Sequence, residues 1–236
     1  MVMFPSLARE RDLWRQGRPR VVGLDEAGLG PLAGPVVAAA CLVPTGCDAI
    51  EGVRDSKTLS PSQRERLYGE ILRQAVAVGV GAASVQEIEI LNVLAASRLA
   101  MRRALARISP YDYVLVDGRE FRDPTLGPHT AIIGGDSLCY SIACASIIAK
   151  VTRDRLMKRL AAIYPVYGWD HNAGYGSPGH LEALRAAGPT PFHRRTFAPV
   201  RSLTGPDLFV DWTPGDGSEP ASARQPSGSG LDDVSP

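Results

Sequence analysis

The hexapeptide Gly23-Leu24-Asp25-Glu26-Ala27-Gly28 joins an apolar run that begins at Val21 to a glycine-rich turn. Neighbouring side chains of an extended strand point to opposite sides of the backbone, so Asp25 and Glu26 present one carboxylate on each side. Acids beside glycine commonly do no more than decorate a turn. Paired carboxylates at the end of a strand are also suited to hold divalent cations, and the hexapeptide alone leaves both interpretations open.

The turn at residues 28–33 fits the relaxed dinucleotide-binding pattern G-x-G-x-x-A, in which the turn opens a helix. The segment that follows, residues 35–43, is instead apolar and β-branched and ends before Pro44. This composition predicts a strand. The turn is therefore expected to connect two strands, and no dinucleotide cofactor is expected.

Composition limits the class of protein. The chain has 236 residues, 44% of them hydrophobic and 22% charged, which is enough to bury one sizeable core. It has no run of about 18 apolar residues, and residues 1–16 lack the apolar segment of a secretory signal. We therefore expect no membrane partner, a cytoplasmic location and, because no feature indicates an interface, a monomer. Small buried thiols, without C-x-x-C spacing, are expected at Cys41, Cys47, Cys139 and Cys144.

Charge and composition change towards the C-terminus. From Arg201 onward the chain has two basic and six acidic residues, whereas residues 1–200 have 24 basic and 19 acidic ones. The mildly basic body is compatible with a polyanionic partner. Gly, Pro and Ser make up 15 of the 34 residues 203–236, so disorder is expected beyond about residue 214. The apolar island at 208–212 is expected to be a strap on the body or, alternatively, a docking motif.

The body is expected to alternate strands and helices in an α/β fold. An apolar run from Val21 leads into the extended acidic pair, apolar runs predict strands over 35–43, 78–83, 111–116 and 130–133, and helical spacing predicts helices over 61–77, 89–108 and 137–163. Three of the strands lead to an acid close to glycine, namely Asp25, Asp117 and Asp136. Sites in open α/β sheets gather where strands end, so these three acids and Glu26 are predicted to converge on one cleft.

Four clustered carboxylates raise one another's pKa, and a divalent cation removes that cost. Mg²⁺ prefers oxygen ligands and is held by carboxylates together with substrate phosphate. Two such ions about 3.5–4 Å apart stabilise both the attacking and the leaving oxygen of a phosphodiester displacement. The acids, the glycine turn and the basic body together indicate a metal-dependent nuclease.

Several motifs, in order and spacing, resemble ribonuclease HII, the type 2 ribonuclease H, over about residues 7–201. They lie at residues 23–36, 55–57, 92–101, 115–118, 145–154 and 174–176. The resemblance implies an endonuclease that cuts RNA paired with DNA, including a single ribonucleotide in duplex DNA on its 5′ side. The products carry 3′-hydroxyl and 5′-phosphate ends, and the cellular role is the removal of ribonucleotides from DNA.

The fold implied by this resemblance is a ribonuclease-H-like mixed five-stranded sheet flanked by helices, followed by a small helical C-terminal region. We expect a catalytic domain over residues 1–165, a helical region with a substrate-contacting loop over 166–202, and a disordered acidic tail over 203–236. The metal-binding and catalytic acids implied are Asp25, Glu26, Asp117 and Asp136. They would hold two Mg²⁺ or Mn²⁺ ions, one to activate water and one to stabilise the leaving 3′ oxygen.

Substrate recognition in this family requires contact with the 2′-hydroxyl, which tells RNA from DNA. The resemblance assigns that contact to the backbone of Gly28, Leu29 and Gly30, where glycine permits close approach. It also places Tyr175 against the sugar and Lys57 against a phosphate. Two positions depart from the family pattern, because Leu29 stands where arginine is usual and Gly134 where lysine is common.

Other polar residues have simpler interpretations. Lys150 and Asp154 are four residues apart in the helix predicted over 137–163 and are expected to pair, with a role of Asp154 beside the metals as the alternative. The histidines have no zinc-binding spacing, but His180 or His193 is expected to brace the region around Tyr175.

Two alternative functions remain open. A type 3 ribonuclease H has the same sheet but is not expected to carry the Gly-Tyr-Gly loop of residues 174–176. A hybrid-binding protein that no longer cleaves belongs to a different class, and the presence of all four acids argues against it.

Overall fold

The computed structural model describes residues 4–119 and 123–204. The predicted disorder beyond residue 214 and the apolar island at 208–212 lie outside these residues, so both stay predictions. Within the described residues, no helix is long and apolar enough to cross a membrane.

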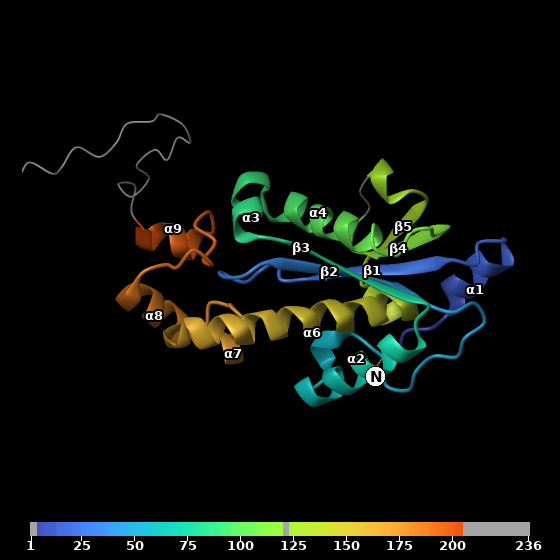
Figure 1. Ribbon diagram of the computed structural model, residues 1–236, viewed down its shortest axis with the longest axis horizontal. Coiled ribbons are helices and arrows are strands. Elements are labelled where there is room, and N and C mark those ends of the chain that lie inside the picture. Colours follow the sequence, from blue (N-terminus) through green and yellow to red (C-terminus); the bar gives the residue numbers. More distant parts are fainter. Residues whose placement is uncertain (1–3, 120–122, 205–236) are drawn as a thin grey trace, which may run out of the picture. The chain divides into compact units, whose positions relative to one another are not determined.

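Five strands form a mixed sheet at the centre of the fold: β1 (Val21–Ala27), β2 (Val36–Leu42), β3 (Ala77–Ala83), β4 (Tyr113–Asp117) and β5 (His129–Ile132). Their order across the sheet is β3-β2-β1-β4-β5 (Figure 1). β2 is antiparallel to both β1 and β3, whereas β1, β4 and β5 run parallel. The sheet confirms the predicted fold class and the strand-turn-strand connection after β1. Its parallel strands bring their C-terminal ends to one edge.

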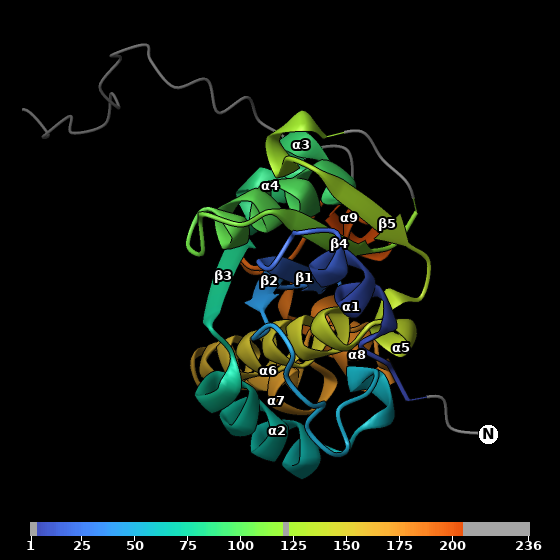
Figure 2. The same cartoon turned by 90° about the vertical axis from the view of Figure 1, so that its right-hand side faces the viewer.

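Helices cover both faces of this sheet. The helices of the described residues are α1 (Ala8–Arg15), α2 (Pro61–Gln74), α3 (Val85–Leu91), α4 (Val93–Leu105), α5 (Gly135–Leu138), α6 (Tyr140–Ile163), α7 (Trp169–Asn172), α8 (Pro178–Ala187) and α9 (Ala198–Thr204). Short 3₁₀ turns lie at Ser56–Thr58, Pro124–Leu126 and Pro165–Tyr167. α4 lies on one face of the sheet, and the long helix α6 crosses the other (Figures 1 and 2).

The alternation of side chains along β1 decides which face each acid meets. Val22 and Leu24 belong to the core cluster under α4, whereas Val21 packs with Ile142 of α6. A Cβ built on Gly23 would lie 2.0 Å from the carbonyl carbon of Ser141, so α6 contacts β1 directly at this glycine. The same alternation directs Asp25 towards α6 and Glu26 towards α4.

Strand β1 carries both acids, because it stays paired with β2 as far as Ala27. Two predicted helix boundaries are wrong. The helix expected over 89–108 is split at Asn92, which has φ +69° and accepts the amide hydrogens of the first turn of α4. The helix expected over 137–163 is interrupted at Cys139, whose extended backbone pairs with Ser6.

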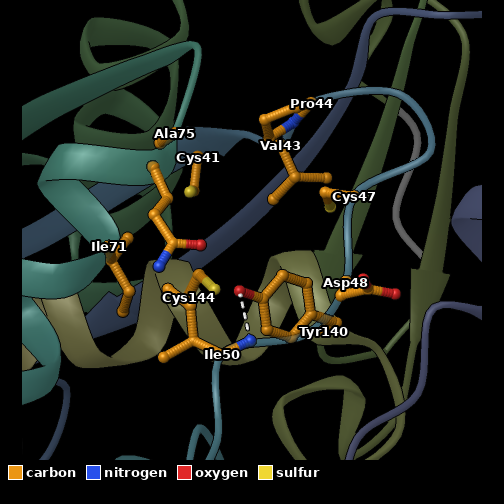
Figure 3. Close-up of a pocket in the computed structure, with 11 residues that line it drawn as sticks. Cys41, Val43, Pro44, Cys47, Asp48, Ile50, Ile71, Ala75, Tyr140 and Cys144 are labelled. Carbon is orange, nitrogen blue, oxygen red and sulfur yellow. Dashed lines mark hydrogen bonds between the residues drawn. The ribbon is translucent and has the colours of Figure 1, made fainter.

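The cysteines are free thiols, as the sequence predicts. Cys41, Cys139 and Cys144 are buried and Cys47 is half-buried. Three of them line a cavity of only ≈ 10 Å³ beside Tyr140, whose hydroxyl accepts the amide hydrogen of Ile50 (Figure 3). A cavity of this size holds no more than about one water molecule, so the thiols act as small packing groups.

A separate apolar cluster holds the C-terminal elements together. It joins Met157 of α6 to Trp169 of α7, Leu184 of α8 and Val200 of α9, and it includes Leu32 from the turn after β1. The turn beside the two acids is therefore packed against the C-terminal region. The domain boundary between residues 165 and 166 stays a prediction.

The start of α6 is capped from α1. Glu10 is completely buried, and its Oε1 accepts hydrogen bonds from the backbone N–H (2.9 Å) and the hydroxyl (2.7 Å) of Ser141. A carboxylate at a helix N-terminus satisfies a free amide and interacts favourably with the helix dipole. Glu10 thus fixes the end of α6 that lies on β1.

The substitution Glu10→Ala is expected to lower the free energy of unfolding by about 1–3 kcal/mol, because it leaves a buried amide without an acceptor. Urea unfolding followed by circular dichroism measures this loss. Glu10→Gln keeps an acceptor and is expected to lose less, and Arg9→Ala, at an exposed neighbouring position, serves as the control. A Glu10→Ala protein within about 0.5 kcal/mol of the unchanged protein would contradict the capping role.

Candidate active site

A cavity of ≈ 430 Å³ opens where the parallel strands end. Strand β1 and the turn after it supply one wall, α6 supplies another, and the 3₁₀ turn at Ser56–Thr58 supplies a third. The predicted site residues that line the cavity are Asp25, Glu26, Gly28, Leu29, Gly30, Lys57, Asp117 and Tyr175. Segments far apart in the sequence therefore meet at the edge that the strand-end argument selected.

The acids form the centre of this site. Carboxylate oxygens of Asp25, Asp117 and Asp136 all lie within 4.8 Å of one another, although Asp136 does not line the cavity itself. Asp25 and Asp136 are buried and Asp117 is half-buried. Glu26 lies outside this tightest group, on the α4 side of β1. The structure thus brings the four predicted acids to one place, with three in close contact.

Lys57 compensates the charges of these acids only in part, because its Nζ lies 3.8 Å from Asp136 Oδ2 while the pKa values of three acids stay raised. Burial raises the pKa of Asp25 well above its ordinary value, and the charges of Glu26 and Asp117 raise it further. Burial, followed by the charge of Asp117, raises the pKa of Glu26 to about 7. Burial also raises the pKa of Asp136, with Asp55 and Asp117 adding to it. Such a cluster of oxygen ligands fits a hard divalent cation.

Backbone amides orient two of the carboxylates. The N–H of Gly135 donates to Asp117 Oδ1 at 2.7 Å, and the N–H of Glu26 donates to Asp25 Oδ1 at 2.7 Å. Gly134 begins this turn with φ +66°, a left-handed conformation that favours glycine. The glycine that replaces the family's common lysine is therefore compatible with the turn that positions Asp136.

Cationic and hydroxyl groups that the sequence analysis did not assign to the site complete the cavity. Ser146, Lys150 and Arg153 line it from α6, and Arg64 lines it from α2. The three residues of α6 are spaced i, i+4 and i+7, so they share one helix face, and this spacing is the signal that could have identified them.

Lys150 also forms the predicted pair with Asp154. The Lys150 Nζ lies 2.7 Å from Asp154 Oδ1, and Arg64 Nη2 lies 3.7 Å from Asp154 Oδ2. Asp154 is therefore held by two cations and is not among the residues that line the cavity. Its observed contacts support the structural interpretation.

The glycine turn and Tyr175 form a second wall of the cavity. Gly28 has φ +106°, and a Cβ at this position would lie 2.2 Å from Arg153 Nε. A Cβ on Gly30 would lie 3.6 Å from the ring of Tyr175, which is half exposed. Leu29 turns its side chain against the core cluster under α4. Leu29 thus packs where the usual arginine would supply a charge.

Lys57 lies at the rim of the cavity. Its Nζ is 3.8 Å from Asp136 Oδ2, and its side chain is 79% exposed. Burial opposes its charge, but Asp136 and Asp55 raise the pKa of the Lys57 ammonium above its ordinary value. Lys57 is therefore an exposed cation beside the acids.

A chain of hydrogen bonds supports the loop of Tyr175, as the sequence analysis expects of His180 or His193. The amide N–H of Thr190 donates to His193 Nδ1 at 2.9 Å, so the proton of this imidazole sits on Nε2. His193 Nε2 lies 3.0 Å from His180 Nε2, and His180 Nδ1 lies 2.8 Å from the carbonyl oxygen of Tyr175. His193 therefore donates from Nε2 to His180 Nε2, and His180 donates from Nδ1 to the carbonyl of Tyr175.

Comparison with known proteins identifies the family. The sequence profile of ribonuclease HII matches residues 22–200. The chain belongs to the ribonuclease HII family. Ribonuclease HII of Thermosynechococcus vestitus is 55% identical over 192 residues, which cover 81% of this chain and 90% of the relative.

Solved structures agree with this assignment. The crystal structure of ribonuclease H2 from Pyrococcus horikoshii is 30% identical with a TM-score of 0.65, over 78% of this chain and 96% of that one. Bst ribonuclease HIII shares the fold alone, with 20% identity and a TM-score of 0.61 over 78% of this chain and 69% of that one. As a ribonuclease HII, the chain is a hydrolase that cleaves RNA strands internally. Enzymes of the ribonuclease HII family depend on divalent metal ions.

Acid is expected to destabilise this ribonuclease HII through the histidine chain. Burial, followed by the charge of His180, lowers the pKa of His193 from 6.5 to about 4. The unfolded chain therefore takes up a proton between these values before the folded chain does. His193 therefore contributes a slope by which the free energy of unfolding falls as the pH falls from about 6.5 to about 4, opposite in sign to the contribution of the acids whose pKa is raised.

Urea unfolding at a series of pH values measures this slope. His193→Phe removes the titrating group and is expected to remove the contribution of His193 to the slope, whereas His171→Gln, at an exposed histidine, should leave the slope unchanged. An identical slope in the His193→Phe protein would exclude His193 as its source.

Proposed function

We propose that this ribonuclease HII cleaves the RNA strand of RNA/DNA hybrids and cuts on the 5′ side of single ribonucleotides in duplex DNA. The products carry 3′-hydroxyl and 5′-phosphate ends, and the enzyme serves to remove ribonucleotides from DNA. One observation carries this proposal: the acid cluster and the wall formed by the glycine turn and Tyr175 face one cavity. A phosphodiester at the acids therefore brings its ribose to that wall.

The acids suit a pair of divalent ions, Mg²⁺ or Mn²⁺. Asp25, Asp117 and Asp136 supply closely spaced carboxylate oxygens, and Glu26 supplies another from the opposite side of β1. When bound, the ions supply activation of the attacking water and stabilisation of the leaving 3′ oxygen. The raised pKa values of Asp25, Glu26 and Asp136 support this assignment, because Lys57 offsets the charge of the carboxylates only in part.

The second wall suits a ribose. The 2′-hydroxyl can both donate and accept a hydrogen bond, and glycines at 28 and 30 let the backbone approach it closely. Tyr175 offers a flat ring beside Gly30, and such a ring packs well against a sugar. Because Leu29 contributes no charged group, recognition at this turn depends on the backbone.

Cations around the cavity suit the phosphates of a duplex. Lys57 is the most exposed of them, and Lys150 and Arg64 lie deeper in the same cavity. Contacts with phosphate fix the register of a duplex but read no sequence. We therefore assign Lys57 to a phosphate beside the cleaved bond. A cytoplasmic location and a monomeric state stay predictions from the sequence.

The substitution Asp117→Asn is expected to lower cleavage by at least roughly a hundredfold, because it removes a metal ligand, while binding of the duplex persists. The substrate is a DNA duplex with one ribonucleotide, incubated with Mg²⁺, Mn²⁺ or a chelator. Melting curves add a second measurement: Mn²⁺ should raise the melting temperature of the unchanged protein but not that of Asp117→Asn.

Asp12→Asn, at an exposed acid of α1, is the matched control for Asp117→Asn. No cleavage by the unchanged protein with either metal would refute the proposed function. Full activity of Asp117→Asn would instead refute the role of this residue alone.

The substitution Tyr175→Ala is expected to lower cutting at a single ribonucleotide by about tenfold or more, since it removes the ring that packs on the sugar. Tyr175→Phe keeps the ring and is expected to retain most activity. Val166→Ala truncates another exposed side chain of the C-terminal region and serves as the control. Rates on a single-ribonucleotide duplex and on a long hybrid are compared, and unchanged rates for Tyr175→Ala would remove this assignment.

A further inference from the structure

Arg194 is a buried cation whose partners are carbonyl groups. It is 0% exposed, and none of the ion pairs in residues 4–119 and 123–204 includes it. Its Nη1 donates to the carbonyl of Leu29 at 2.9 Å, and its Nη2 donates to the carbonyl of Gly28 at 2.6 Å. Its Nε and Nη2 both donate to Gly34, at 3.0 and 2.8 Å. The guanidinium thus holds the whole glycine turn from inside the protein.

This cation is costly to bury. A charged group without a counter-ion loses hydration that carbonyl dipoles replace only in part. Burial, followed by the charge of Arg153, lowers the pKa of Arg194 to about 9. The planar guanidinium has five donors in a fixed fork, and this geometry meets three carbonyls of one turn at once.

The inward carbonyls set the direction of the turn's amides. In a trans peptide the C=O and the following N–H point to opposite sides. Because the carbonyls of Gly28 and Leu29 point to buried Arg194, the N–H groups of Leu29 and Gly30 point away from it. Among the described residues, no backbone carbonyl accepts a hydrogen bond from these two N–H groups. Because Leu29 and Gly30 line the cavity, their N–H groups are available as donors on its wall.

His193, which precedes Arg194, supports the loop of Tyr175 on the other side of the same wall. His193 contacts His180, which in turn contacts the carbonyl of Tyr175. The backbone strengthens this connection, because Arg194 N–H donates to Leu32 O and Leu32 N–H donates to Gly174 O, both at 2.8 Å. One dipeptide therefore connects the glycine turn to the loop of Tyr175.

We propose that His193 and Arg194 are positioning residues that set the distance between the free amides of the glycine turn and the Tyr175 ring. This distance decides how well the wall distinguishes a ribose from a deoxyribose. The inference rests on the proposed function and adds residues that do not touch the substrate. It also explains how the turn can bind a ribose although Leu29 stands where arginine is usual. Arg194 holds the backbone of the turn in place, so the backbone amides can make the contact that a charged side chain at position 29 does not supply.

The test is the substitution Arg194→Lys, which keeps the charge but loses the planar fork. Two constants are measured with Mg²⁺: the KM for a duplex with one ribonucleotide, and the Ki of an all-DNA duplex of the same sequence as a competitor. Binding of the all-DNA duplex depends mainly on phosphates, so its Ki should stay within about twofold. The KM should rise about tenfold, the effect of losing roughly one well-placed hydrogen bond.

Two substitutions of His193 test the other half of the pair. His193→Phe keeps the ring volume but breaks the hydrogen-bond chain, and it is expected to raise the ratio of KM to Ki as Arg194→Lys does. His193→Gln restores a donor towards His180 and is expected to recover part of the loss. Arg73→Lys, at an exposed position of α2, is the matched control and should leave both constants unchanged.

The outcomes separate this inference from the proposed function. If the unchanged enzyme shows no preference for the ribonucleotide duplex, the proposed function fails and the positioning pair fails with it. If the unchanged enzyme discriminates but the variants lose only maximal rate, with KM and Ki unchanged, the two residues merely support folding and the inference is overturned. Should Arg194→Lys not fold, the ratio measured for His193→Phe decides in the same way.

Discussion

Helix α6 rests directly on β1 at Gly23, and the position of every group in the site follows from this contact. Any side chain at Gly23 would collide with the backbone of Ser141. The close approach brings the face of α6 that carries Ser146, Lys150 and Arg153 over the cavity. Glu10 fixes the same end of α6 through its two hydrogen bonds to Ser141. The site is therefore built on a layer in which helix and strand backbones touch directly.

The site contains buried carboxylates at the strand ends and buried guanidinium groups beside the glycine turn, and these opposite charges do not pair with each other. The carboxylates at the strand ends repel one another, and their raised pKa values reflect this repulsion together with burial. The guanidinium groups of Arg153 and Arg194 bind backbone carbonyls instead of these acids. This separation leaves the carboxylates available for metal ions and keeps the turn rigid. A salt bridge between a guanidinium group and a carboxylate would have taken the carboxylate from the metal ions and the guanidinium from the carbonyls of the turn.

Sequence periodicity predicted the sheet and the long helices well, because the apolar runs are long and the glycines mark the connections. Its errors occur where a local conformation depends on distant partners. Asn92 splits a helix that apolar spacing presents as continuous, and Cys139 is extended because it pairs with Ser6.

The sequence by itself determined the family, because its motifs occur in order at the family's spacing, and it predicted the four acids, the glycine turn and Tyr175 as site residues, because acids at strand ends are chemically informative. It also indicated the support given by His180 and His193, without their partners. Only the tertiary structure decided which carboxylates meet within 4.8 Å and that Arg194, 160 or more residues along the chain from the turn, binds its carbonyls. The physical reason is that such contacts depend on how α6 and the C-terminal elements pack, and no local pattern in the sequence records the distance between segments that meet only in the folded chain.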